Sequence, residues 1–175
     1  DINATPTQNP VNFVFAHKMS KAHFTFENNV GSDDYAFVIS EIYVSGLYTE
    51  GVYEIGADKP WSVSKVTQNK LSFGAGEYEP SETSLANGKT ATSNLARTFL
   101  PAEYGESNKF TVSFTAYILY KGTTISEKPY TLNVAHTFEE GHAYNFVIGL
   151  EAGNKITFSV TSLNGWAEDD PVTVN

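Results

Sequence analysis

The sequence predicts an all-β fold, an antiparallel sandwich or barrel with Greek-key connections. Apolar residues recur at every second position in several runs, which is the period of a β-strand. Glycine-bearing or polar turns separate these runs, and no stretch of ten residues shows a convincing helical period. About ten short strands without a repeat of constant length or alternating helices are typical of this class.

The chain of 175 residues is long enough for one well-packed domain and short for two. Residues 1–10, "DINATPTQNP", are polar and contain two prolines. This composition is typical of a linker or a cut edge. We therefore expect one β-sandwich domain over residues 11–175.

The first strands change phase. Apolar positions are odd at first and even later, as in Val11, Phe13 and Phe15 and then in Ala22, Phe24 and Phe26. Such a switch requires an extra residue or a turn. We expect a bulge or kink within residues 16–21.

The remaining strands follow in order. Two long runs rich in β-branched and aromatic residues are "YAFVISEIYVSG", residues 35–46, and "KFTVSFTAYILYKG", residues 109–122. Residues 142–163 predict two strands joined by a turn at "EAGN". Shorter strands are expected in "GVYEIG", "NKLSFG", "ARTFL", "KPYTLNV" and the terminal "PVTVN". Residues 74–94, rich in Ser, Thr and Gly, are expected to form a long surface or mobile loop.

Charge and composition exclude several partners. The formal net charge is −9, so nucleic acid and anionic lipid surfaces are not expected partners. The chain contains no cysteine, which excludes disulfides, thiolate nucleophiles and cysteine zinc sites. No apolar run reaches the roughly 20 residues of a membrane-spanning helix, so we expect no direct membrane insertion.

Histidines raise the question of a metal site. His17 and His23 are six residues apart, but the phase change between them breaks their common register, and no third ligand is near in sequence. His136 and His142 bracket Glu139 and Glu140, which places four possible ligands within seven residues. We interpret this group as a solvated connection, predict no cofactor, and leave a metal titration to decide the alternative.

No motif indicates an enzyme. A nucleophile elbow of the G-x-S-x-G kind is absent, and paired carboxylates such as Asp33 and Asp34 lie in predicted turns. Trp61 and Trp166 have two interpretations, as plugs at the sandwich edge or as rings exposed for sugar stacking. The second interpretation gives an alternative function, a surface glycan-binding module.

Ordered motifs give a family resemblance. "VNFVFAHKMSKAHFTF" resembles the first strand of fimbrillin-like proteins of the Bacteroidales, through Phe15, His17 and Lys21 together with Met19 and Ser20. "FLP" at residues 99–101 and "FEEGHAYNFVIGL" with Gly141 and Tyr144 follow in the same order. The closing segment, which contains Trp166, also fits.

The resemblance implies a transthyretin-like β-sandwich that is exported as a lipoprotein and serves, without catalysis, in fimbriae at the cell surface or outer membrane. It matches the C-terminal domain of a two-domain protein. Expected partners are other fimbrial subunits and a host or bacterial surface ligand. Subunits of the family are thought to join by strand exchange, which makes Val172, Thr173 and Val174 of the "PVTVN" tail candidate donor residues.

Overall fold

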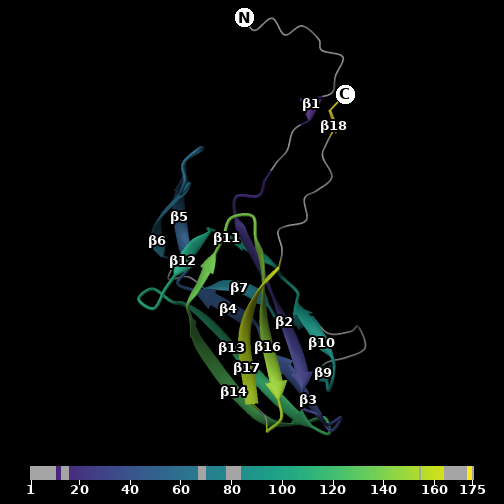
Figure 1. The fold of residues 1–175 in the computed structure, drawn as a ribbon. Coiled ribbons are helices and arrows are strands. Elements are labelled where there is room, and N and C mark those ends of the chain that lie inside the picture. The colour runs from purple at the N-terminus through teal and green to yellow at the C-terminus, as the bar shows by residue number, and fades with distance from the viewer. Residues whose placement is uncertain are drawn as a thin grey trace, which may run out of the picture.

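The computed structural model describes residues 11–12, 16–66, 70–77, 84–153, 155–163 and 173–174. Within these ranges every regular element is a β-strand (Figure 1). Two larger sheets pack face to face as a β-sandwich, which confirms the predicted class. The described residues include no helix long and apolar enough to cross a membrane.

The first sheet contains the first and the last strand, in chain order, of the two larger sheets. Its central strand is β2 (Ser20–Asn29). One edge of β2 pairs with β16 in parallel, whereas the other pairings described are antiparallel. The opposite edge of β2 pairs first with β11 and then with β10. The other strands of this sheet are β8 (Gly76–Glu77), β10 (Thr90–Ser93), β11 (Arg97–Phe99), β16 (Ala143–Glu151) and β17 (Lys155–Leu163).

The second sheet is built around β13 (Phe110–Tyr120), the long strand predicted from its alternation. One edge of β13 pairs with β14, and the other pairs with β4 and then β3. Its other strands are β3 (Tyr35–Ile39), β4 (Ile42–Ser45), β7 (Leu71–Gly74), β9 (Leu85–Ala86) and β14 (Thr123–Val134). Three short two-stranded sheets complete the fold: β1 (Val11–Asn12) with β18 (Thr173–Val174), β5 (Tyr48–Tyr53) with β6 (Trp61–Val66), and β12 (Ala102–Tyr104) with β15 (His136–Phe138).

The core lies between the two larger sheets and is rich in phenylalanine. Phe24 of β2 meets Phe73 of β7 with ring centroids 5.0 Å apart, and Phe146 of β16 lies 5.9 Å from Phe110 of β13. Strand β16 therefore faces β13, and β2 faces β7. The predicted inward positions of β2, Ala22, Phe24 and Phe26, are fully buried.

The run at residues 35–46, predicted as one strand, is two strands. Phe37 and Ile39 are buried at odd positions, whereas Ile42 and Val44 are buried at even positions. Ser40 lies at the break, where its backbone N–H donates to Thr115 O at 2.9 Å and its hydroxyl accepts from Thr115 N at 2.8 Å. The hydroxyl thereby takes over a backbone role, and the second half of the run keeps its apolar face toward the core.

The expected loop at residues 74–94 is the clearest correction. Its described parts contain β8, β9 and β10, and Leu85 is only 2% exposed. Short strands of two to four residues carry too little alternation to be recognised against a Ser, Thr and Gly background. The turn at "EAGN", in contrast, joins β16 and β17 as predicted.

Candidate functional site

The phase change in the first strands lies at a short segment outside the sheets. Residues 16–19 belong to no strand, and β2 begins at Ser20. The predicted break in the strand is therefore confirmed. We call residues 16–21 the joint.

A turn at residues 139–142, between β15 and β16, holds the joint by backbone hydrogen bonds. Gly141 N donates to Met19 O at 3.1 Å, and Lys21 N donates to His142 O at 3.0 Å. The Ser20 hydroxyl, fully buried, donates to Glu139 O at 2.9 Å. These bonds satisfy polar backbone groups that the break before β2 would otherwise leave unpaired.

Glycine is required at the centre of this turn. Gly141 has φ of +70°, and a Cβ atom there would lie 3.0 Å from the backbone oxygen of His17. A side chain would therefore be strained in its own backbone and crowded against the joint. Two residues of the family motif, His17 and Gly141, thus meet in space although they are far apart in sequence.

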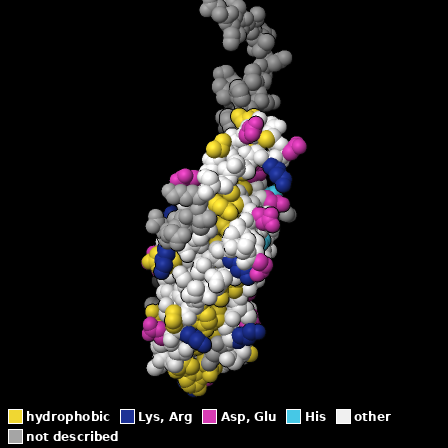
Figure 2. Space-filling view, turned by 90° about the vertical axis from the view of Figure 1, so that its left-hand side faces the viewer, with side chains coloured by type: hydrophobic (Ala, Val, Ile, Leu, Met, Phe, Trp, Pro, Cys, Tyr) yellow, Lys and Arg dark blue, Asp and Glu magenta, His cyan; other side chains and the backbone are white. Residues whose placement is uncertain are grey.

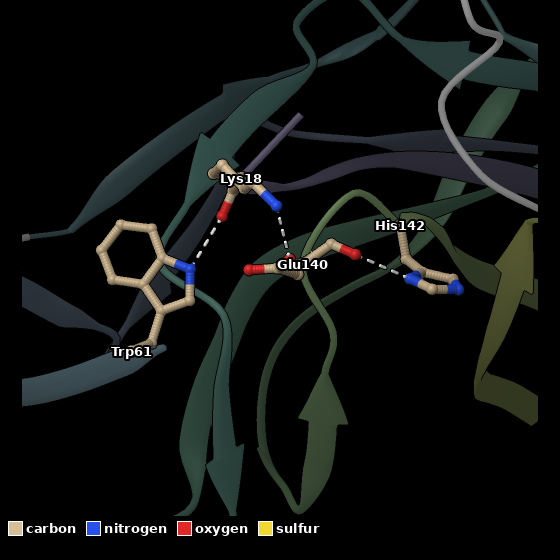
Figure 3. A network of polar contacts seen from close by, with 4 residues as sticks. All are labelled: Lys18, Trp61, Glu140 and His142. Atoms are coloured by element: carbon tan, nitrogen blue, oxygen red, sulfur yellow. Dashed lines mark hydrogen bonds and ion pairs between the residues drawn. The ribbon is translucent and has the colours of Figure 1, made fainter. Parts of the chain in front are cut away.

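Side chains add a second set of contacts around Lys18 (Figure 3). Its ammonium group lies 2.9 Å from Glu140 Oε1, and its backbone oxygen accepts a hydrogen bond from Trp61 Nε1 at 3.0 Å. The ammonium group also lies 5.3 Å from the centroid of the Tyr53 ring. Hydrogen bonding to Tyr53, and to a smaller extent to Glu140, raises the pKa of Lys18. The joint is therefore held between the 139–142 turn and the β5–β6 hairpin.

Trp61 is half-buried and lies in β6, with its ring 5.2 Å from that of Tyr53. Its N–H is bonded to the joint, and its ring makes an edge contact with Tyr53, so its observed contacts are structural. Trp166 lies outside the described residues. Trp61 as a glycan-binding residue stays a prediction.

The four histidines lie in different surroundings. His17 is exposed and His23 is half-buried on β2. His142 Nδ1 lies 2.9 Å from Glu140 O, and its Nε2 lies 3.6 Å from a Glu139 carboxylate oxygen. Across the ranges described, no group of three or more His, Asp or Glu side chains is arranged to hold a metal ion.

His136 packs among aromatic rings at the end of the core. Its ring centroid lies 4.9 Å from Phe138 and 5.2 Å from Tyr144, and its buried Nε2 has no hydrogen-bond partner among the described residues. Burial lowers the pKa of His136, opposed in part by Glu139. Tyr144 is only 2% exposed, and its hydroxyl oxygen accepts a hydrogen bond from Glu139 N at 2.7 Å.

The lowered pKa of His136 predicts that the protein loses stability in mild acid. Because its pKa is lowered in the folded state, the unfolded chain binds a proton more readily once the pH falls below the ordinary value of about 6.5. We expect the free energy of unfolding to fall between pH 7.5 and 5.5, and to fall less in His136→Gln. Urea unfolding at both pH values measures this, with exposed Thr137→Ala as the control. An equal fall in wild type and His136→Gln would contradict it.

An apolar cavity of about 310 Å³ opens beside the joint. Its apolar lining comes from Met19, Leu47, Leu71, Phe99 and Leu100. Such a lining suits an aliphatic or aromatic group better than a charged one. On the face drawn in Figure 2, Lys and Arg side chains are scattered among acidic ones.

The predicted donor residues are described in part. Thr173 and Val174 form β18, which pairs antiparallel with β1 through Asn12↔Thr173 and Val11↔Val174. Phe15 and Val172 lie outside the described residues. Lys21 is exposed at the start of β2, where its backbone is bonded to the 139–142 turn.

Sequence reasoning missed the contact of Lys18, which shows no pattern of its own because its partner, Glu140, is distant in sequence. Ser20 was named only as a motif residue, and its bond to Glu139 was missed. Asn28 was also missed, although a signal existed. It continues the inward series of Phe24 and Phe26, and a polar residue at such a position requires buried partners.

Comparison with solved structures places the fold. The chain is similar to a candidate cell adhesion protein of Parabacteroides distasonis, with 11% identity over 84% of this chain and 52% of that chain and a TM-score of 0.52. Weaker likenesses are a candidate cell adhesion protein of Bacteroides ovatus (18% identity, 87% and 47% coverage, TM-score 0.47) and a fimbrial protein of Bacteroides vulgatus (13%, 87% and 55%, 0.45). The chain spans about half the length of these structures.

No curated protein matches the chain. A family model, in contrast, covers nearly all of it: the model described as fimbrillin-like matches residues 2–166. This match includes the joint, the 139–142 turn and every strand of the two larger sheets. The chain belongs to the fimbrillin-like family.

Proposed function

We propose that this chain is a non-enzymatic structural and adhesive component of bacterial cell-surface fimbriae. The observation that carries the proposal is the fimbrillin-like match over residues 2–166. The contacts of the joint support it, because they hold strands in place: the Lys18 ammonium group binds Glu140, and the Lys18 backbone oxygen binds Trp61. Side chains arranged in this way stabilise the fold.

We further propose assembly by strand exchange, with the C-terminal tail as the donated strand. The tail alternates Val172, Thr173 and Val174, so one face offers two valines to core pockets. Among the described residues, β18 pairs with Val11 and Asn12 of β1, apart from the two larger sheets. After exchange, a receiving edge supplies the backbone partners of the tail.

In this proposal residues 11–175 form one sandwich domain that corresponds to the C-terminal domain of a two-domain subunit. The protein is exported, anchored as a lipoprotein at the outer membrane, and incorporated into the fimbrium. Its partners are other fimbrial subunits and a ligand on a host or bacterial surface. Phe15, His17, Lys21, Gly141, Tyr144 and Trp166 act as structural residues of the family motif.

Deletion of residues 171–175 from the intact protein tests the assembly proposal. We expect fimbriae to disappear from electron micrographs of the cell surface, and the subunit ladder on unheated gels to collapse to monomer. Val172→Thr with Val174→Thr should weaken assembly, because it removes the apolar face, whereas Thr173→Ser should leave it intact. Unchanged fimbriae after the deletion would rule out the tail as donor.

A further inference from the structure

Strand β17 forms one edge of the first sheet, beyond β16. No strand in the described part of the chain pairs with its outer edge. Strand β14 is likewise an edge of the second sheet. Because β16 faces β13, the two edge strands lie on the same side of the sandwich (Figure 1).

The two edges differ in how they are protected. Strand β14 carries Pro129 in its middle, next to Glu127 and Lys128, and such residues discourage further pairing. Strand β17 has a single charge, Lys155, at its first position. From Ile156 to Leu163 it contains no proline, glycine or charge. A nine-residue edge of this composition is suited to pairing with another strand.

The inward side chains of β17 are also incompletely covered. Ile156, Phe158 and Val160 are only partly buried. Their neighbours on β16 in the pairing register, Leu150, Ile148 and Phe146, are at most 1% exposed. A further strand beside β17 would cover this remaining apolar surface.

The sequence of β17 is complementary to itself. If two copies run antiparallel with Ser159 opposite Ser159, Phe158 meets Val160 and Thr157 meets Thr161, each pair occurring twice. Aromatic with β-branched residues and Thr with Thr are favourable cross-strand pairs. The core-facing side chains Ile156, Phe158 and Val160 stay on the apolar face, where Ile156 meets Ser162. On the other face Lys155 lies opposite Leu163, away from the other lysine.

We propose that β17 pairs with β17 of a second copy of this chain and joins the two first sheets into one continuous sheet. The contact is isologous, so it closes as a dimer, unlike the strand exchange proposed above, which continues along a fimbrium. One pair of edge strands buries little surface, so the dimer is expected to depend on protein concentration. Because each copy has a net charge of −9, it should also be favoured by salt.

Disulfide trapping tests the register. Because the chain contains no cysteine, an introduced cysteine can link only to its copy in a second chain. Ser159 is exposed, so Ser159→Cys leaves the core unchanged. Opposed residues of antiparallel strands lie about 4.5–5.5 Å apart at Cα, within the range of a disulfide. We expect Ser159→Cys to give a disulfide-linked dimer under mild oxidation. Thr157→Cys, which faces Thr161, and Thr131→Cys on β14 should link much more slowly.

Ser159→Lys gives a second readout, since it sets two ammonium groups opposite each other at the symmetry axis. We expect sedimentation velocity to show dimer in the wild type and in Thr131→Lys, and monomer in Ser159→Lys with an unchanged melting temperature. Deletion of residues 171–175 should leave the dimer intact, which separates this contact from strand exchange. A monomeric wild type at about 1 mM protein, or equal linking of Ser159→Cys and Thr131→Cys, would overturn the proposal.

Discussion

Replacing Phe146 by alanine is expected to lower the free energy of unfolding by about 3–5 kcal/mol, the usual cost of removing a buried phenylalanine ring. Phe146 is 1% exposed and lies at the centre of the core. Its ring contacts four others, which come from both larger sheets and from β15: Phe24, Phe110, Phe138 and Phe158. Such surroundings cannot collapse into the space, because the rings are held by separate strands.

Urea unfolding followed by circular dichroism measures this change, with Ile125→Ala as the matched control. Ile125 is 51% exposed on edge strand β14, so its truncation should change stability by less than about 0.5 kcal/mol. If Phe146→Ala is too unstable to purify, Phe146→Leu keeps most of the volume and should cost less. A Phe146→Ala protein within about 1 kcal/mol of wild type would show that β16 does not pack as described.

Most strands of the fold could be predicted from the alternation of apolar and polar residues, because this alternation reflects which side chains face the core. In β13 the even-numbered positions from Phe110 to Tyr120 were predicted to face the core. Those from Phe110 to Ile118 are buried, whereas Tyr120, at the end of the strand, is 37% exposed. The hairpin of β16 and β17 was predicted for the same reason, with a glycine turn between two alternating runs. Alternation does not record which strands become neighbours. The parallel pairing of β2 with β16 could therefore not be predicted from the alternation.

The joint shows why the candidate site was predicted only in part. The change from odd to even apolar positions located the break correctly, since strand register is a local property. What fastens the break is not local. Lys18 bonds to Glu140 over a separation of 122 residues, and Trp61 reaches the backbone of Lys18 from another hairpin. Only the tertiary structure brings these groups together.

Asn28 is expected to give the other large effect, because it is a fully buried polar side chain that links the two sheets. From β2, its Nδ2 donates to Leu85 O at 2.9 Å and to Tyr35 O at 3.3 Å, both in the second sheet. Its Oδ1 accepts from Val30 N at 3.2 Å. Asn28→Ala leaves these groups without partners and should lower the free energy of unfolding by about 3 kcal/mol, measured by urea unfolding.

Asn28→Asp separates hydrogen bonding from mere volume. A carboxylate has no N–H to donate. Its oxygen atoms, which only accept hydrogen bonds, would lie next to two further acceptors, the carbonyl oxygens of Leu85 and Tyr35. Burial then raises the pKa of the aspartate in the folded state above its unfolded value of about 3.9. The unfolded chain ionises first as the pH rises, so the variant loses stability relative to wild type between pH 4 and 7. In Asn28→Ala the difference from wild type should not change with pH. An Asn28→Asp deficit that is equally independent of pH would mean that this side chain is not enclosed between the sheets.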